Sequence, residues 1–157
     1  MIKAINIAKK HGISVKGLQS MDGMEGLAWR ANVLIDRKMV GSVSNDGRGG
    51  MAHVDIPKQD IARILEAYKE YGAPLDIYGS VRDEDRVENF IGALVDELET
   101  VKKFKRICKT KTAVRLQDDP DGEIVIFKAA YSPEVKIKIV EKYPNVEYFV
   151  NELLMEV

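Results

Sequence analysis

The alternation of hydrophobic and polar residues predicts a β-hairpin in the first third of the chain. Between residues 26 and 35 the hydrophobic side chains of one face are Leu27, Trp29, Ala31, Val33 and Ile35. This period of two is typical of a half-buried strand. A polar break at residues 36–38 separates it from a second short strand at residues 39–44, and this order indicates a hairpin. Residues 51–56 are expected to add a third strand, and residues 13–18 show a weaker strand pattern.

Hydrophobic residues at helical spacing predict two helices in the middle of the chain. Pro57 suits the first position of a helix, where its missing N–H is not needed. The apolar residues after it are Ile61, Ile64, Leu65, Tyr68 and Tyr71, and Gly72 with Pro74 ends the run. A longer helix begins near Ser80, because Ser80 and Asp83 have the spacing of a capping box. Its apolar stripe comprises Val87, Phe90, Ile91, Leu94, Leu98 and Val101 and extends toward Cys108.

Two β-branched runs, residues 110–117 and 123–129, predict a second hairpin because residues 118–122 supply turn chemistry. Residues 133–143 fit either a helix or a strand, and we favour a short helix because Ser132-Pro133-Glu134 is a specific start signal. Residues 145–154 fit both patterns, and this alternative stays open. The fold class is therefore α+β, with an antiparallel sheet built from two β-hairpins packed against two to three helices. We expect residues 1–157 to form a single compact domain, whereas the pattern leaves open whether the hairpins share one sheet.

Composition and charge narrow the class of protein. The chain is 45% hydrophobic and 31% charged, which is ordinary for a globular protein and excludes intrinsic disorder. A net charge of −1 gives no overall attraction to nucleic acid or to an anionic membrane. Residues 1–16 lack the apolar segment of a signal peptide, and no uncharged run has membrane-spanning length. Cys108 is the single cysteine and is expected to be a buried small hydrophobe, so we predict a soluble, cytoplasmic protein.

A basic cluster follows the long predicted helix and is expected to be a solvated helix face. Its members are Lys102, Lys103, Lys105, Arg106, Lys109 and Lys111, with Arg115 beyond them. Acidic residues 83–85 begin the same helix, so the two sets of charges complement the helix dipole. The cluster lacks the interleaved aromatic residues of a single-strand platform. We therefore do not expect nucleic acid as a partner.

Most catalytic and metal-binding motifs are missing from the sequence. It has no phosphate loop, no zinc-protease motif, no paired cysteines and only two histidines. Asp119 and Asp121 match part of a calcium loop, but Gln117 and Lys128 stand where further ligands are required. We predict no metal site, no cofactor and no catalytic residue. An enzyme using Asp46 and His53 as acid and base ranks last, because no obvious nucleophile accompanies them.

The strongest candidate for a binding site is the segment Asn45-Asp46-Gly47-Arg48-Gly49-Gly50. Its glycines permit positive φ angles and close approach of a ligand to the backbone. Successive amides in such a turn form an anion-binding nest, to which Arg48 adds a bidentate contact. His53 is close in sequence, and Arg30 is expected on the same side of the sheet. The alternative is that the segment is only a wide connection between two strands. A strand and not a helix follows it, so the electric field of a helix N-terminus, which strengthens anion binding, is missing.

Residues 36–41, Asp36-Arg37-Lys38-Met39-Val40-Gly41, followed by the glycine-rich segment, resemble small uncharacterised proteins found in phage and prophage genomes. The resemblance covers residues 26–53, with the closing hairpin and the tail at Asn151-Glu152 as a further extension. It implies an accessory role in infection or host interaction, and it implies no specific activity.

Together these features favour a small non-enzymatic binding protein that holds an anionic or nucleotide-like ligand at the glycine-rich loop. The predicted ligand-binding residues are Asn45, Asp46, Gly47, Arg48, Gly49, Gly50, His53 and Arg30. The alternative is a protein–protein interaction module that inhibits or modulates a host protein. Such a module would use a hairpin edge or the methionines around the first hairpin, Met21, Met24, Met39 and Met51. We expect no membrane partner, and the oligomeric state stays open.

Overall fold

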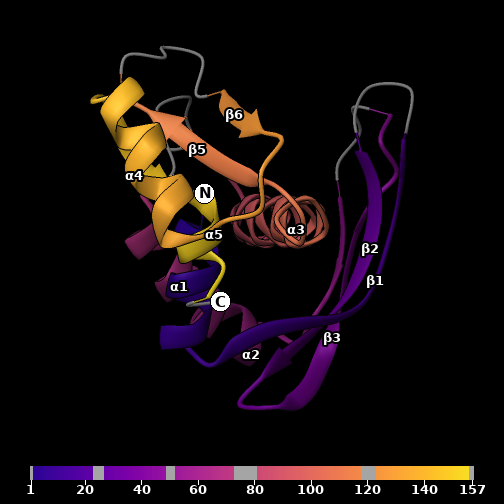
Figure 1. Cartoon of the computed structure of the whole chain (residues 1–157). Coiled ribbons are helices and arrows are strands. Elements are labelled where there is room, and N and C mark those ends of the chain that lie inside the picture. The colour runs from indigo at the N-terminus through magenta and orange to yellow at the C-terminus, as the bar shows by residue number, and fades with distance from the viewer. Residues whose placement is uncertain (1, 23–26, 49–51, 73–80, 118–122, 156–157) are drawn as a thin grey trace. The chain divides into compact units, whose positions relative to one another are not determined.

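The computed structural model describes residues 2–22, 27–48, 52–72, 81–117 and 123–155. These residues form five helices and two antiparallel sheets, which confirms the predicted α+β class (Figure 1). The chain divides into two compact units, Met1–Leu98 and Glu99–Val157. The division falls inside helix α3 (Asp83–Ile107), which contributes residues to both units. The single compact domain stays a prediction.

The first unit contains a four-stranded sheet in the order β1-β2-β3-β4. The strands are β1 (Ile13–Asp22), β2 (Leu27–Ile35), β3 (Lys38–Asn45) and β4 (His53–Asp55). The predicted β2–β3 hairpin is confirmed. Its two turn residues, Asp36 and Arg37, have positive φ angles of 49° and 69°, as a tight hairpin turn requires.

Strand β1 extends beyond the predicted residues 13–18. The prediction ends too early because a bulge interrupts the hydrophobic alternation of the strand. The pairing with β2 shifts between Lys16 and Gln19, and Gly17 lies there with a φ of 61°. An extra residue in one strand reverses the faces that follow it. The sequence pattern therefore loses the strand at residue 18, whereas the backbone continues to Asp22.

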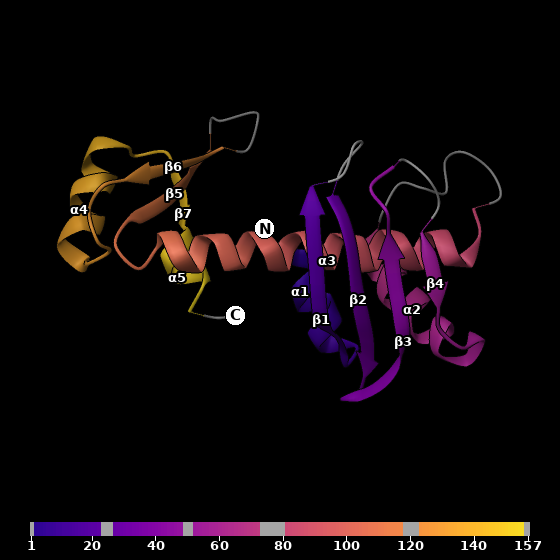
Figure 2. The ribbon, with the colours of Figure 1, turned by 90° about the vertical axis from the view of Figure 1, so that its right-hand side faces the viewer.

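Helices cover one face of this sheet. Helices α1 (Lys3–Lys10), α2 (Lys58–Tyr71) and the first part of α3 lie on the same side of the strands (Figures 1 and 2). The predicted α2 is confirmed, and Gly72 ends it with a left-handed φ of 68°. Pro57 is the N-cap and not the first helical residue, which is Lys58. Ser80 and Pro74 lie outside the described residues. No described helix of this unit covers the other face of the sheet, which we call the open face.

The sequence analysis predicts no element at residues 3–10, where the structure has helix α1. No side chain of its own caps the start of this helix. Instead Glu97 of α3 accepts a hydrogen bond from the Ile5 amide at 2.9 Å, so a distant carboxylate satisfies a terminal N–H. At the other end, Lys10 and His11 bind Glu70 of α2 at 2.8 and 2.9 Å. The hydrogen bonds from Lys10 and His11 lower the pKa of Glu70 below its ordinary value of 4.5.

The second unit contains a three-stranded sheet in the order β6-β5-β7. Strands β5 (Thr112–Leu116) and β6 (Ile124–Phe127) form the predicted second hairpin, whose turn residues 118–122 lie outside the described residues. The two hairpins thus lie in separate sheets. Residues 133–143 are helical, as favoured, in α4 (Pro133–Lys142), where Ser132 Oγ accepts a hydrogen bond from the Val135 amide. The ambiguous tail is both strand and helix, β7 (Val146–Phe149) and α5 (Val150–Leu153).

Asn151 joins three segments of the second unit. Its side-chain oxygen accepts a hydrogen bond from the Ala113 amide of β5 at 2.9 Å. Its side-chain nitrogen donates to the carbonyl of Lys111 at 3.0 Å and to that of Cys108, just after α3, at 3.5 Å. Asn151 is only 6% exposed, so this buried amide uses both its acceptor and its donors. It therefore fixes the end of α3 against the start of β5.

Candidate functional site

The register of the first sheet brings Arg30 and His53 to one face. Arg30 of β2 faces Gln19 of β1 on one side and Ser44 of β3 on the other. Ser44 in turn faces His53 of β4. Residues directly opposite each other across antiparallel strands share a face. Arg30 and His53 are both exposed, so this polar row lies on the open face of the sheet.

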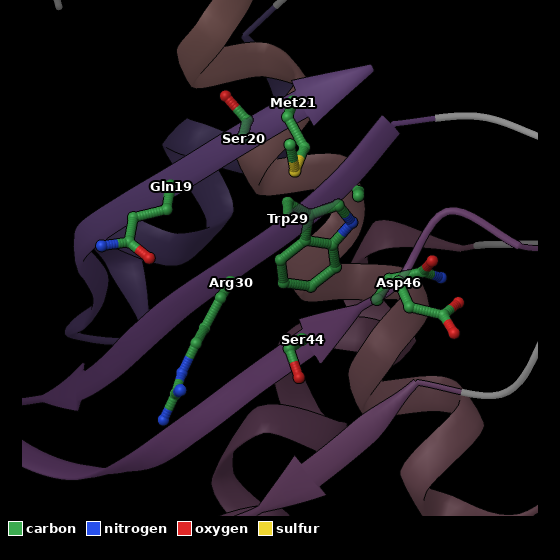
Figure 3. A pocket seen from close by; sticks show the side chains of 9 residues that line it. Gln19, Ser20, Met21, Trp29, Arg30, Ser44 and Asp46 are labelled. Carbon is green, nitrogen blue, oxygen red and sulfur yellow. The ribbon is translucent and has the colours of Figure 1, made fainter. Parts of the chain in front are cut away.

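A groove of about 440 Å³ lies at the end of the sheet where β1 finishes and β2 begins. Figure 3 shows the side chains that line it; they belong to Gln19, Ser20, Met21, Ala28, Trp29, Arg30, Ser44, Asn45 and Asp46. Its size is within the range of small-molecule sites. Three of the predicted ligand-binding residues, Arg30, Asn45 and Asp46, line this groove.

Apolar and polar residues both line the groove. Met21 is 70% exposed, whereas Trp29 is 8% exposed. The Trp29 indole lies against Gly92 of α3, where an added Cβ atom would stand 3.6 Å from the ring. Arg30 forms no hydrogen bond or ion pair with any residue in the described part of the chain. Its guanidinium thus retains its full set of donors for a ligand.

Two backbone amides of the glycine-rich segment already have acceptors within the segment. The Gly47 amide donates to Asn45 Oδ1 at 2.8 Å, and the Arg48 amide donates to Asp46 Oδ1 at 3.1 Å. These are Asx turns, in which a side chain replaces the acceptor that a ligand would offer. Gly47 has a φ of 67°, and Arg48 is exposed. Gly49 and Gly50, two members of the predicted nest, lie outside the described residues.

Glu88 of α3 is a residue of this region that the sequence analysis missed. Its Oε1 accepts a hydrogen bond from Asn45 Nδ2 at 2.7 Å, and its Oε2 accepts a longer one from the Ala52 amide at 3.4 Å. An internal carboxylate therefore binds the donors at the end of β3 and just before β4. In the sequence Glu88 is one of several acids on a long helix, and nothing marks it apart from its neighbours. Only the packing of α3 beneath the sheet brings it there.

Other candidates from the sequence lie elsewhere. Cys108 is half-buried, not fully buried as expected, and lines a cavity of about 300 Å³ in the second unit with Tyr131 and Asn151. Burial raises the pKa of its thiol, which disfavours the nucleophilic thiolate. In the basic cluster, Lys102 pairs with Glu99 at 3.5 Å. The described residues contain no group of three or more ligands that could hold a metal ion.

Two of the four methionines singled out in the sequence are exposed: Met21, which lines the groove, and Met39, at 60%. Met24 and Met51 lie outside the described residues. Among the helices described, none is long and apolar enough to cross a membrane. Comparison of the chain with models of protein families, with curated proteins and with solved structures finds no match.

Proposed function

We propose that this protein is a non-enzymatic binding protein that holds a small anionic or nucleotide-like ligand in the groove of the open face. The observation that carries this proposal is the exposed guanidinium of Arg30, which lines an apolar groove without a partner among the described residues. A guanidinium presents a planar fork of donors that matches a carboxylate or a phosphate. The resemblance to phage and prophage proteins and the single cysteine support an accessory role in the cytoplasm.

The residues around Arg30 support the same ligand class. Gln19 and Ser44, its cross-strand neighbours, supply further hydrogen-bond donors beside the anionic group. Met21 and Ala28 offer apolar contact area to the body of the ligand. His53 and Arg48 extend the polar surface away from the groove. Since the Gly47 and Arg48 amides have internal acceptors, the proposed anion contacts side chains and not the backbone of these two residues.

Trp29 makes the proposal directly testable, because it is the only tryptophan of the chain and lines the groove. Adenosine monophosphate would be titrated while the emission of Trp29 is recorded. We expect saturable binding, weakened about tenfold or more in Arg30→Gln, because hydrogen bonds to charged groups contribute roughly 1.5–3 kcal/mol. Arg37→Gln is the matched control, since Arg37 is an exposed arginine at the turn of the same hairpin. Equal affinity in Arg30→Gln, or no change in Trp29 emission up to about 10 mM nucleotide, would refute the proposal.

The second candidate function is a protein–protein interaction that inhibits or modulates a host protein. The observation that favours it is the exposure of Met21 and Met39 on the first sheet, because flexible thioether side chains adapt to partner surfaces. A host protein retained in stoichiometric amount by the natural chain should then be lost from the double variant Met21→Ser, Met39→Ser. Retention of the same partner by that variant would exclude this surface.

A further inference from the structure

The groove carries opposite charges on its two sides. Figure 3 shows Arg30 and Asp46 on opposite sides of Trp29. Asp46 Oδ1 accepts the hydrogen bond from the Arg48 amide, whereas its Oδ2 has no hydrogen-bond partner in the described parts of the chain. Asp46 is exposed and forms no ion pair with Arg30 or with any other described residue. Both charges are therefore available to a ligand at the same time.

Two apolar residues of the groove lie on the same face of the sheet as Arg30. Met21 faces Ala28 across the β1–β2 pair, and Ala28 is two residues from Arg30 along β2, so this apolar pair shares the face of Arg30. Arg30 faces Ser44, and Asp46 follows two residues after Ser44, just beyond the end of β3. The Arg30 side chain points away from Asp46 (Figure 3).

We infer that the ligand of this groove is a zwitterion, with its anionic group at Arg30, its amino group at Asp46 and an apolar body that contacts Met21 and Ala28. This inference rests on the proposed function and names the ligand class. A carboxylate or phosphate satisfies the guanidinium fork, while an ammonium group neutralises the carboxylate on the far side. A polyphosphate fits less well, because its extra negative charges approach Asp46.

The test compares probes that share an apolar chain and differ in charge. Trp29 emission is titrated with 6-aminohexanoate, 8-aminooctanoate, hexanoate and hexylamine. We expect the better of the two amino acids to bind about threefold to fivefold more tightly than hexanoate, which is the effect of one exposed ion pair. Asp46→Asn should remove this advantage. The asparagine keeps the acceptor for the Arg48 amide, so the local turn persists. Arg30→Gln should weaken the amino acids and hexanoate alike.

The outcomes separate this inference from the proposed function. If adenosine monophosphate and hexanoate bind while neither amino acid binds more tightly than hexanoate, the zwitterion is wrong and the anion site stands. The same conclusion follows if Asp46→Asn leaves the advantage of the amino acids intact. If no anionic probe changes Trp29 emission, both proposals are wrong. Far-ultraviolet circular dichroism of each variant checks that its fold is retained.

Discussion

Replacing Asn151 by alanine should destabilise the second unit. The substitution leaves the Ala113 amide and the Lys111 carbonyl without the partners that lie at 2.9 and 3.0 Å. A buried polar group left without a partner costs roughly 1–3 kcal/mol. Because Lys111 is exposed, water can partly satisfy its carbonyl, and the contact to Cys108 at 3.5 Å is long. We therefore expect a loss of about 2–4 kcal/mol, a large part of the roughly 5–15 kcal/mol typical of a domain.

Urea denaturation followed by far-ultraviolet circular dichroism measures this loss, and hydrogen exchange of the Ala113 amide locates it. Asn6→Ala is the matched control, since Asn6 is exposed on α1; it should change stability by less than about 0.5 kcal/mol. The near-isosteric Asn151→Asp keeps an acceptor for Ala113 but turns an oxygen toward two carbonyls. It should therefore be destabilising at neutral pH. Equal stability of Asn151→Ala and the control, with unchanged exchange at Ala113, would refute the structural role of this amide.

Three further predictions concern the first unit. Glu88→Gln should increase the hydrogen-exchange rate of the Ala52 amide and shift the emission of Trp29, which faces Asn45. We expect a loss of about 1–2 kcal/mol of stability, because these hydrogen bonds lose their charged acceptor. Glu84→Gln, at an exposed position of the same helix, is the control, and identical behaviour of both variants would contradict the role of Glu88 as this acceptor. The pKa of Glu70 is lowered in the folded protein, so its stabilising contribution is present above about pH 4.5 and is lost as pH falls through the lower folded pKa. Glu70→Gln should flatten the dependence of unfolding free energy on pH below 4.5, and an unaltered acid slope would show that its ion pairs add no stability. Gly41→Ala places a Cβ atom 1.9 Å from the Asp55 carbonyl oxygen, so it should cost about 1–3 kcal/mol by overpacking; an unchanged melting temperature would contradict the close approach of the two strands.

Several elements could be predicted from the sequence because their signals are local. The β2–β3 hairpin follows from strict alternation around a polar break, and α2 follows from helical spacing that ends at Gly72. Helix α4 needed its start signal to outweigh a competing strand pattern, and the cap at Ser132 explains why the helix forms. Arg30, too, could be placed beside a candidate site, since the strand period puts it on the polar face.

The remaining features depend on contacts between residues far apart in the sequence. Helix α1 receives its cap from Glu97, 92 residues along the chain, and the tail changes from strand to helix near Asn151, which binds α3 and β5 segments. Likewise, the bulge at Gly17 sets which β1 residues face Arg30, and α3 delivers Glu88 to the end of β3. The period of a sequence determines which elements form and which face is apolar. Tertiary packing decides which acceptor pairs with each buried or terminal donor. The reason is that a hydrogen bond requires donor and acceptor to be close in space, not close along the chain.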